Sequence, residues 1–258
     1  MRLLAIGLLL GLAIGLGLAL SFHARRIHDE LLLAARFGRA GLVTNEYAYY
    51  NPFAGEAHRS HVWVMTSGSL FARDGAGWSG IPDRRRPGLD SRAATDSAVF
   101  RLVTHRAFDN VAVSFRWRLL ALVTTPQTPA RAWDGVHLWL RYRNPSWLYY
   151  VSVARRDGEI VIGKKLPGGP VNGGRYIQLI SPRRHPWIRG RWQKARATIA
   201  TGTDGTVTIR LLAGNRLIAR AVDRGDGVSG APITEPGRIG IRGDNANFEF
   251  RDLEVRSV

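Results

Sequence analysis

The side chains best suited to binding a ligand are concentrated in one stretch, "DGVHLWLRYRNPSWLYYVSV", residues 134–153. Side chains along a β-strand alternate between its two faces, so a strand over residues 135–142 places His137, Trp139 and Arg141 together. A flat indole flanked by an imidazole and a guanidinium is a surface on which a sugar ring stacks while its hydroxyls meet hydrogen-bond donors. The opposite face is then predicted to be core and consists of Val136, Leu138, Leu140 and Tyr142.

Four further residues extend this candidate ligand-binding face. Two alternate along the strand after the Asn-Pro turn, and one lies on the next strand. The fourth lies in a glycine-rich segment, residues 164–179, which we interpret as a loop that covers the face. The four residues are Trp147, Tyr149, Lys165 and Arg175. The sequence leaves one alternative open, namely that Trp139 is covered and belongs to a second, minor core.

The elements that position these residues are predicted to be β-strands. In "VAVSFRWRL", residues 111–119, five apolar side chains alternate with small or charged ones, which indicates one buried face and one wet face. Similar stretches follow to the C-terminus, separated by turn dipeptides, and such a block predicts a sandwich or barrel. A change of alternation between Phe250 and Leu253 predicts a β-bulge in the last strand.

The chain begins with an apolar segment. Residues 3–22 carry no charge and have the length of a bilayer-spanning helix. We interpret residues 1–24 as an uncleaved signal anchor, because signal peptides have shorter apolar runs of roughly 7–15 residues. Residues 25–41 show helical spacing and predict a short juxtamembrane helix. More arginines follow the span than precede it, so our expectation of an extracytoplasmic domain conflicts with the positive-inside rule.

Composition excludes several classes of protein. The 258 residues contain 37 Lys and Arg against 20 Asp and Glu, a formal net charge of +17, which attracts polyanions. No basic helix, zinc-ligand spacing or RNA-binding motif accompanies this charge, so we expect no specific nucleic-acid recognition. The absence of cysteine excludes disulfides and thiol catalysis.

Three stretches resemble the concanavalin A-like lectin/glucanase superfamily, especially its laminin-G-like and 3-keto-disaccharide-hydrolase-like members. They are the early "VWVMTSGSLFARDGAGWSG", the central "GVHLWLRY…WLYYVSVARRDGEIVIGKK" and the final "GRIGIRGDNANFEFRDLEV". The resemblance covers residues 42–258 and implies an all-β fold, a two-sheet antiparallel jelly-roll sandwich. Because the superfamily includes enzymes, lectins and carbohydrate-binding modules, the resemblance specifies the fold far more than the function.

The resemblance also bears on catalysis and metal binding. Glucanases of this superfamily carry a Glu-x-Asp-x-x-Glu strand, which is absent here, and the nearest acidic cluster, Glu249, Asp252 and Glu254, has the opposite spacing. Related jelly rolls often bind a structural calcium ion through an early ligand and an Asp near the last strand. Glu46 and Asp244 occupy the comparable positions, although Asp244 equally fits an Asx turn.

The leading hypothesis is a membrane-anchored, extracytoplasmic, non-catalytic module that binds a cell-wall or extracellular glycan. Its predicted partners are a polysaccharide or anionic cell-envelope polymer and, through residues 3–22, the membrane. One alternative is a glycoside hydrolase or lyase of the 3-keto-sugar type that uses His137 and a nearby carboxylate such as Asp134. The other is an envelope structural or protein-interaction module, whose corresponding face would be filled by loops and apolar side chains.

Overall fold

The computed structural model describes residues 29–82, 97–171 and 174–258. The predicted signal anchor, residues 1–24, lies outside the described residues. Within the described ranges, no helix is long and apolar enough to cross a membrane.

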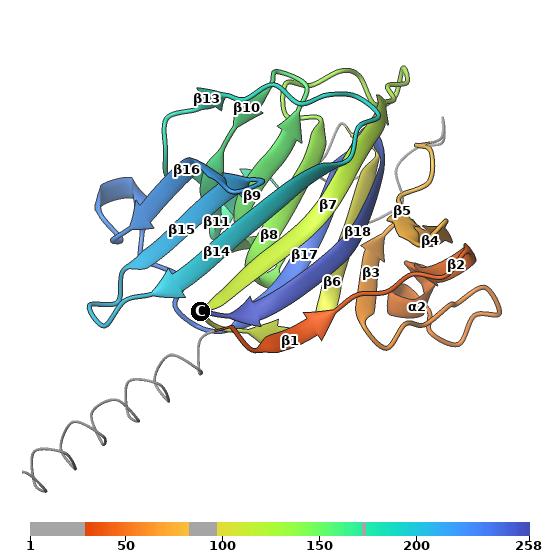
Figure 1. Ribbon diagram of the computed structural model, residues 1–258, viewed down its shortest axis with the longest axis horizontal. Helices are drawn as coiled ribbons and strands as arrows, with labels where there is room; N and C mark the ends of the chain where they lie inside the picture. The colour runs from red at the N-terminus through yellow and green to blue at the C-terminus, as the bar shows by residue number, and fades with distance from the viewer. Residues whose placement is uncertain (1–28, 83–96, 172–173) are drawn as a thin grey trace, which may run out of the picture.

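Two antiparallel sheets stack one in front of the other (Figure 1). The nine-stranded sheet has the order β16 (Arg216–Asp223), β15 (Val207–Ala213), β14 (Gln193–Thr201), β7 (Val111–Leu122), β18 (Ala246–Ser257), β5 (Ala76–Trp78), β4 (Ser69–Arg73) and β2 (Ala40–Asn45), with β1 (Leu31–Ala34) paired to β18. The seven-stranded sheet has the order β12 (Gly174–Gln178), β11 (Ile162–Val171), β9 (Trp147–Arg155), β8 (Gly135–Asn144), β17 (Gly237–Asp244), β6 (Val99–Phe108) and β3 (Trp63–Ser67). The other described elements are the pair β10 (Glu159–Ile160) and β13 (Arg183–Arg184), helix α2 (Tyr47–Tyr50) and the 3-10 turn η1 (Gly227–Ser229).

The core lies between the sheets because the strands present apolar faces to one another. On β7, Val113, Phe115 and Trp117 are buried in the core, whereas Arg116 is exposed. Leu138 and Ile241 of the seven-stranded sheet belong to the same core cluster. The all-β sandwich predicted from the period-two alternation is confirmed.

Strand β18 contains the predicted bulge. Its pairing with β7 shifts between Arg251 and Glu254, and Asp252 in the gap has a φ of 52°. The extra residue allows Phe250 and Leu253 to lie in the same core although an odd number of positions separates them.

The helix expected over residues 25–41 is wrong for its described part, residues 29–41. Leu31–Ala34 forms β1 instead, which pairs with the end of β18, and Ser257 N donates a hydrogen bond to Glu30 O at 3.0 Å. The open edge of β18 supplies backbone partners, and this pairing outweighs the local helical spacing. The sandwich therefore begins before residue 42, and β1 starts beside the C-terminus (Figure 1).

The loop expected over residues 164–179 is also wrong, because most of this segment is paired strand. β11 and β12 form a hairpin in which Lys164 lies opposite Ile177 and Lys165 lies opposite Tyr176. The hairpin extends the seven-stranded sheet and brings Lys165 and Tyr176 side by side.

Candidate functional site

A bulge in β8 changes which residues share a face. Trp139 lies opposite Gly240 of β17, and Tyr142 lies opposite Arg238. Leu140 and Arg141 on β8 therefore both face one residue of β17, the residue between Arg238 and Gly240. Arg141 has a φ of 49°. In a bulge of this kind the two residues on the longer strand point to the same side, and the alternation is inverted beyond them. Arg141 therefore turns inward with Leu140, and the prediction that it shares a face with His137 and Trp139 is wrong.

The Arg141 side chain is fully buried and ties two loops together. Its Nη1 donates to Ile233 O at 2.7 Å, and its Nη2 donates to Asp109 Oδ1 at 3.1 Å and to Asn110 Oδ1 at 2.9 Å. Burial lowers the pKa of Arg141, and the nearby Asp109 carboxylate opposes this effect. Arg141 thus stabilises one end of the sandwich and does not reach a ligand on the outer face.

Trp139 is covered, as the alternative interpretation of the sequence required. Its side chain is 3% exposed and stacks in parallel on Tyr142, with ring centroids 5.1 Å apart. Val103 and Leu148 complete this second core cluster, on the outer face of the seven-stranded sheet. The prediction of an open indole is therefore wrong, and so is the prediction that Tyr142 packs in the main core.

The four other predicted residues lie in four different places. Tyr149 is in the main core, where its hydroxyl donates to Asp223 Oδ2 at 2.6 Å, and burial raises its pKa. Trp147 is 37% exposed at the β8–β9 turn, with Arg143 over its ring. Arg175 is exposed on β12. Lys165 is buried on the outer face of the seven-stranded sheet.

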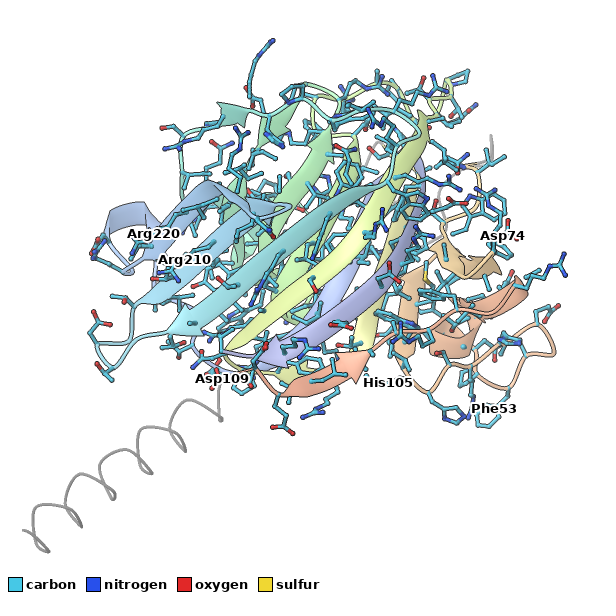
Figure 2. All side chains as sticks on the ribbon, viewed as in Figure 1. Phe53, Asp74, His105, Asp109, Arg210 and Arg220 are labelled. Carbon is cyan, nitrogen blue, oxygen red and sulfur yellow. The ribbon has the colours of Figure 1, made fainter. Side chains whose placement is uncertain are left out.

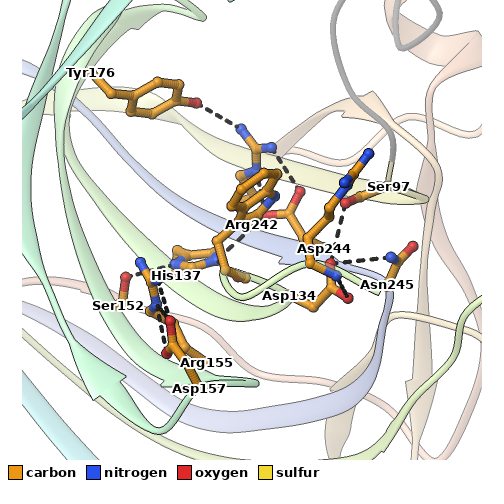
Figure 3. A network of polar contacts seen from close by, with 12 residues as sticks. Ser97, Asp134, His137, Ser152, Arg155, Asp157, Tyr176, Arg242, Asp244 and Asn245 are labelled. Atoms are coloured by element: carbon orange, nitrogen blue, oxygen red, sulfur yellow. Dashed lines mark hydrogen bonds and ion pairs between the residues drawn. The ribbon is translucent and has the colours of Figure 1, made fainter. Parts of the chain in front are cut away.

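His137 lies at the centre of a polar network that includes Ser152 and Asp244 (Figure 3). His137 Nδ1 is 2.9 Å from Ser152 Oγ, and Nε2 is 3.0 Å from the carbonyl oxygen of Trp133 and 3.4 Å from Asp244 Oδ2. The residue types are those of a nucleophilic triad. However, Arg242 occupies both carboxylate oxygens of Asp244, and His137 Nε2 lies closer to the Trp133 carbonyl oxygen than to Asp244, so Asp244 does not orient the imidazole as the acid of a triad does. The network instead fixes the position of Asp244.

Asp244 in turn holds Arg242. Arg242 donates through Nε and Nη2 to the two carboxylate oxygens, each at 2.7 Å, and through Nη1 to Tyr176 Oη at 3.2 Å. Burial alone would raise the pKa of Asp244, but Arg242 and His137 outweigh it and hold this pKa well below its usual range. Burial alone would lower the pKa of Arg242, but Asp244 outweighs it, so Arg242 stays protonated.

Asp134, the carboxylate of the enzyme alternative, is fully buried and engaged on both oxygens. It accepts hydrogen bonds from Ser97 Oγ, Asn245 Nδ2, Arg131 N and the Arg156 guanidinium. To act as a base, this carboxylate would first have to lose those partners.

Three basic side chains gather on the outer face of the seven-stranded sheet, and we call Arg101, Lys165 and Arg242 the cation cluster. Arg101 on β6 lies directly opposite Arg242 on β17. Lys165 Nζ lies 4.8 Å from the centroid of the Tyr176 ring, and the hydroxyl of that ring accepts from Arg242. The Tyr176 ring also meets the Tyr150 ring edge to face, at 5.5 Å.

The cation cluster perturbs Lys165. Burial, and then repulsion from Arg242 and Arg101, lower the pKa of Lys165 from 10.5 to about 8. Tyr176, 41% exposed, forms the accessible border of the cluster. Of these residues, only Lys165 is predicted from the sequence as a ligand-binding residue. The sequence signal that could have identified the other two cations is an arginine within an apolar run. Arg101 lies in "VFRLV" and Arg242 lies in "GRIGIRG", and alternation directs both side chains away from the core.

The predicted calcium ligands do not fit a metal site. Both oxygens of Asp244 are occupied by Arg242, while Glu46 Oε2 accepts the backbone N–H of Gly68 at 2.7 Å. Among the residues that the structure describes, no group of three or more His, Asp or Glu side chains is arranged to hold a metal ion.

The strand order and the stacked sheets define this chain as an all-β sandwich of two antiparallel sheets, with the architecture of a jelly roll. No protein-family model and no curated protein sequence matches it. Among solved structures it is similar to the carbohydrate-binding module CBM66 from Bacillus subtilis, with a TM-score of 0.51, 11% identity, and coverage of 76% of this chain and 95% of that chain. The metal-free carbohydrate recognition domain of Emp46p gives a TM-score of 0.51 and 10% identity over 76% of this chain and 88% of that chain. A LamA variant from Z. galactanivorans, in complex with laminaritriose and laminaritetraose, gives a TM-score of 0.53 and 8% identity over 89% of this chain and 100% of that chain. At these identities the likeness establishes the fold.

Proposed function

We propose that this protein is a non-catalytic glycan-binding module whose ligand contacts the outer face of the seven-stranded sheet at the cation cluster. The observation that carries the proposal is the combination of buried cations with the half-exposed ring of Tyr176. Aromatic faces stack on sugar rings, and ammonium and guanidinium groups donate hydrogen bonds to sugar hydroxyls. Binding sites typically place a few such polar groups among aromatic walls.

The similar solved structures support this proposal. One is a carbohydrate-binding module, one is a carbohydrate recognition domain and one holds two oligosaccharides. A shared fold does not transfer a function by itself, so recognition of a glycan must come from the side chains of this chain.

We further propose that residues 1–24 anchor the module in a membrane and that the β domain is extracytoplasmic. The support is the length and apolar character of residues 3–22. The proposed partner of the extracytoplasmic β domain is a cell-wall or extracellular polysaccharide. A topology reporter fused to Val258 tests this arrangement, and activity of the reporter only in the cytoplasm would reject it.

Binding of the described domain to a glycan array tests the proposed function. The wild-type domain is expected to bind a subset of glycans, and Tyr176→Ala is expected to weaken that binding about tenfold or more, which is within the range for loss of one aromatic contact. Trp192→Ala is the matched control, because Trp192 is a half-buried aromatic residue that contacts Arg118 and Arg251. Absence of all glycan binding, or equal losses in the two variants, would reject the proposal.

A second candidate function is an envelope structural or protein-interaction module. It is favoured by the apolar side chains that fill part of the same face, where Trp139 and Tyr142 stack on each other. This candidate predicts no binding anywhere on the array and no effect of Tyr176→Ala on interactions of the protein.

A further inference from the structure

Two consecutive lysines on β11 have opposite environments. Lys164 points between the sheets, where its Nζ donates to Asp223 Oδ2 at 2.7 Å and to two backbone carbonyl oxygens. Lys165 points to the outer face and is only 1% exposed. Among the described residues no hydrogen-bond acceptor or carboxylate pairs with Lys165, whose ammonium lies over the Tyr176 ring.

Arg101 is the second buried cation without a counter-ion in the described part of the chain. It is 4% exposed, its Nε has no hydrogen-bond partner, and no described carboxylate forms an ion pair with it. Two other arginines of the described chain differ, because the buried Arg141 pairs with Asp109 and the partly buried Arg242 pairs with Asp244.

Charge in the cation cluster is therefore unbalanced. Among the described residues, Asp244 pairs with Arg242, while Arg101 and Lys165 have no carboxylate partner, so these four side chains carry a net charge of +2. Removing a cation from water without a compensating anion is strongly unfavourable, and proteins normally pair such groups. Unpaired buried cations lower the stability of the fold, and groups held in this way are typical of functional sites. At such a site a bound anion would supply the missing negative charge.

We propose that Arg101 and Lys165 bind anionic substituents of the glycan, which are carboxylate, sulfate or phosphate groups, so that the module selects acidic glycans over neutral ones. This inference rests on the proposed function, since it assigns the ligand class of the same site. Arg101 presents planar N–H donors that match two oxygens of such a group, and Lys165 supplies a compact point charge. Arg242 is held by Asp244, and Tyr176 lies next to Lys165, where its ring is placed to stack on a sugar ring.

The exposed arginines elsewhere do not make an equivalent site. Arg210 and Arg220 lie opposite each other on β15 and β16, exposed on the outer surface of the nine-stranded sheet (Figure 2). Water and salt screen such charges, so they attract any polyanion weakly and without selectivity. A test of the proposal must separate this general attraction from binding at the cation cluster.

The experiment measures binding of the domain to polygalacturonate and to its methyl ester, a matched pair with the same backbone and with the charge removed. Dextran sulfate and unmodified dextran provide a second pair, and vesicles containing phosphatidylglycerol provide an anionic surface without sugar. The variants are Lys165→Met, Arg101→Met and the charge-retaining Lys165→Arg. Lys194→Met is the control, because Lys194 is an exposed lysine on β14. Cooperative urea unfolding of each variant shows that it is folded, and Lys165→Met alone suffices if Arg101→Met does not fold.

Wild type is expected to bind at least one charged polymer at least tenfold more tightly than its neutral partner. Lys165→Met and Arg101→Met should each remove most of this preference, Lys165→Arg should retain it, and Lys194→Met should change it less than twofold. Equal binding of charged and neutral polymers would overturn the inference but leave the proposed function intact. Losses as large in Lys194→Met would show general attraction and overturn the inference. Absence of glycan binding, with or without vesicle binding that depends on Lys165, would overturn both.

Discussion

Replacement of Lys165 by methionine is expected to make the folded domain more stable at pH 7. Methionine keeps most of the length and apolar contact of the lysine stem but carries no charge. In the wild-type protein, burial and two neighbouring arginines lower the pKa of Lys165 from 10.5 to about 8. Each tenfold change in a protonation constant corresponds to about 1.4 kcal/mol, so the charged form destabilises the fold by about 3 kcal/mol.

The pH dependence of this effect has a defined sign. Below pH 8, Lys165 is protonated in both the folded and the unfolded chain, so its full destabilising effect is present. Between about pH 8 and 10.5 the folded protein releases this proton while the unfolded chain retains it, and wild-type stability rises relative to that of the variant. The free-energy gap between Lys165→Met and wild type should therefore be about 2–3 kcal/mol at pH 7 and shrink steadily above pH 8.

Urea unfolding at pH 7, 8, 9 and 10 measures this gap. Lys194→Met is the control for the same substitution at an exposed position, and it should change stability by less than about 0.5 kcal/mol. The reasoning is refuted if Lys165→Met is no more stable than wild type at pH 7, or if the gap is constant across this pH range. A residue whose removal stabilises the fold but abolishes binding is the expected behaviour of a binding residue held at a cost to stability.

Three further predictions concern binding and packing. Affinity for an acidic glycan, measured by calorimetry, should fall about tenfold between pH 7 and pH 9 in wild type as Lys165 loses its proton, and Lys165→Arg should abolish this dependence. The ionisable groups that face Lys165 or the rest of the cation cluster are Arg101, Arg242, Asp244, His137, Tyr142, Tyr150 and Tyr176. Trp139→Ala should lower the free energy of unfolding by about 3–5 kcal/mol in urea melts because Trp139 is core, whereas Trp147→Ala at the exposed turn should cost less than about 1 kcal/mol. Asp223→Ala should destabilise the domain by about 3 kcal/mol or more by calorimetric melting, since it leaves the Lys164 ammonium without its counter-ion, and a loss below about 1 kcal/mol would contradict this account.

The period-two alternation was sufficient to predict many of the strands, most of their core faces and the bulge in β18, but not β1 or the β11–β12 hairpin. These features depend on neighbours in the chain, because successive side chains of a strand must point to opposite faces. In the same way alternation separates Lys164 from Lys165 and directs Arg242 outward. The sequence therefore determined the all-β sandwich and the face on which most of these side chains lie.

Tertiary structure alone decided the composition of the site. The bulge at Arg141 arises from its pairing with β17, where two residues of β8 face one, and it exchanged the faces of Arg141 and Tyr142. Whether Trp139 is open depends on Tyr142 stacking on it, which follows from that bulge. The charge balance around Lys165 depends on strands far apart in the sequence, because Arg101 comes from β6. Local alternation tells which way a lysine points, but only the fold determines whether a carboxylate meets it there.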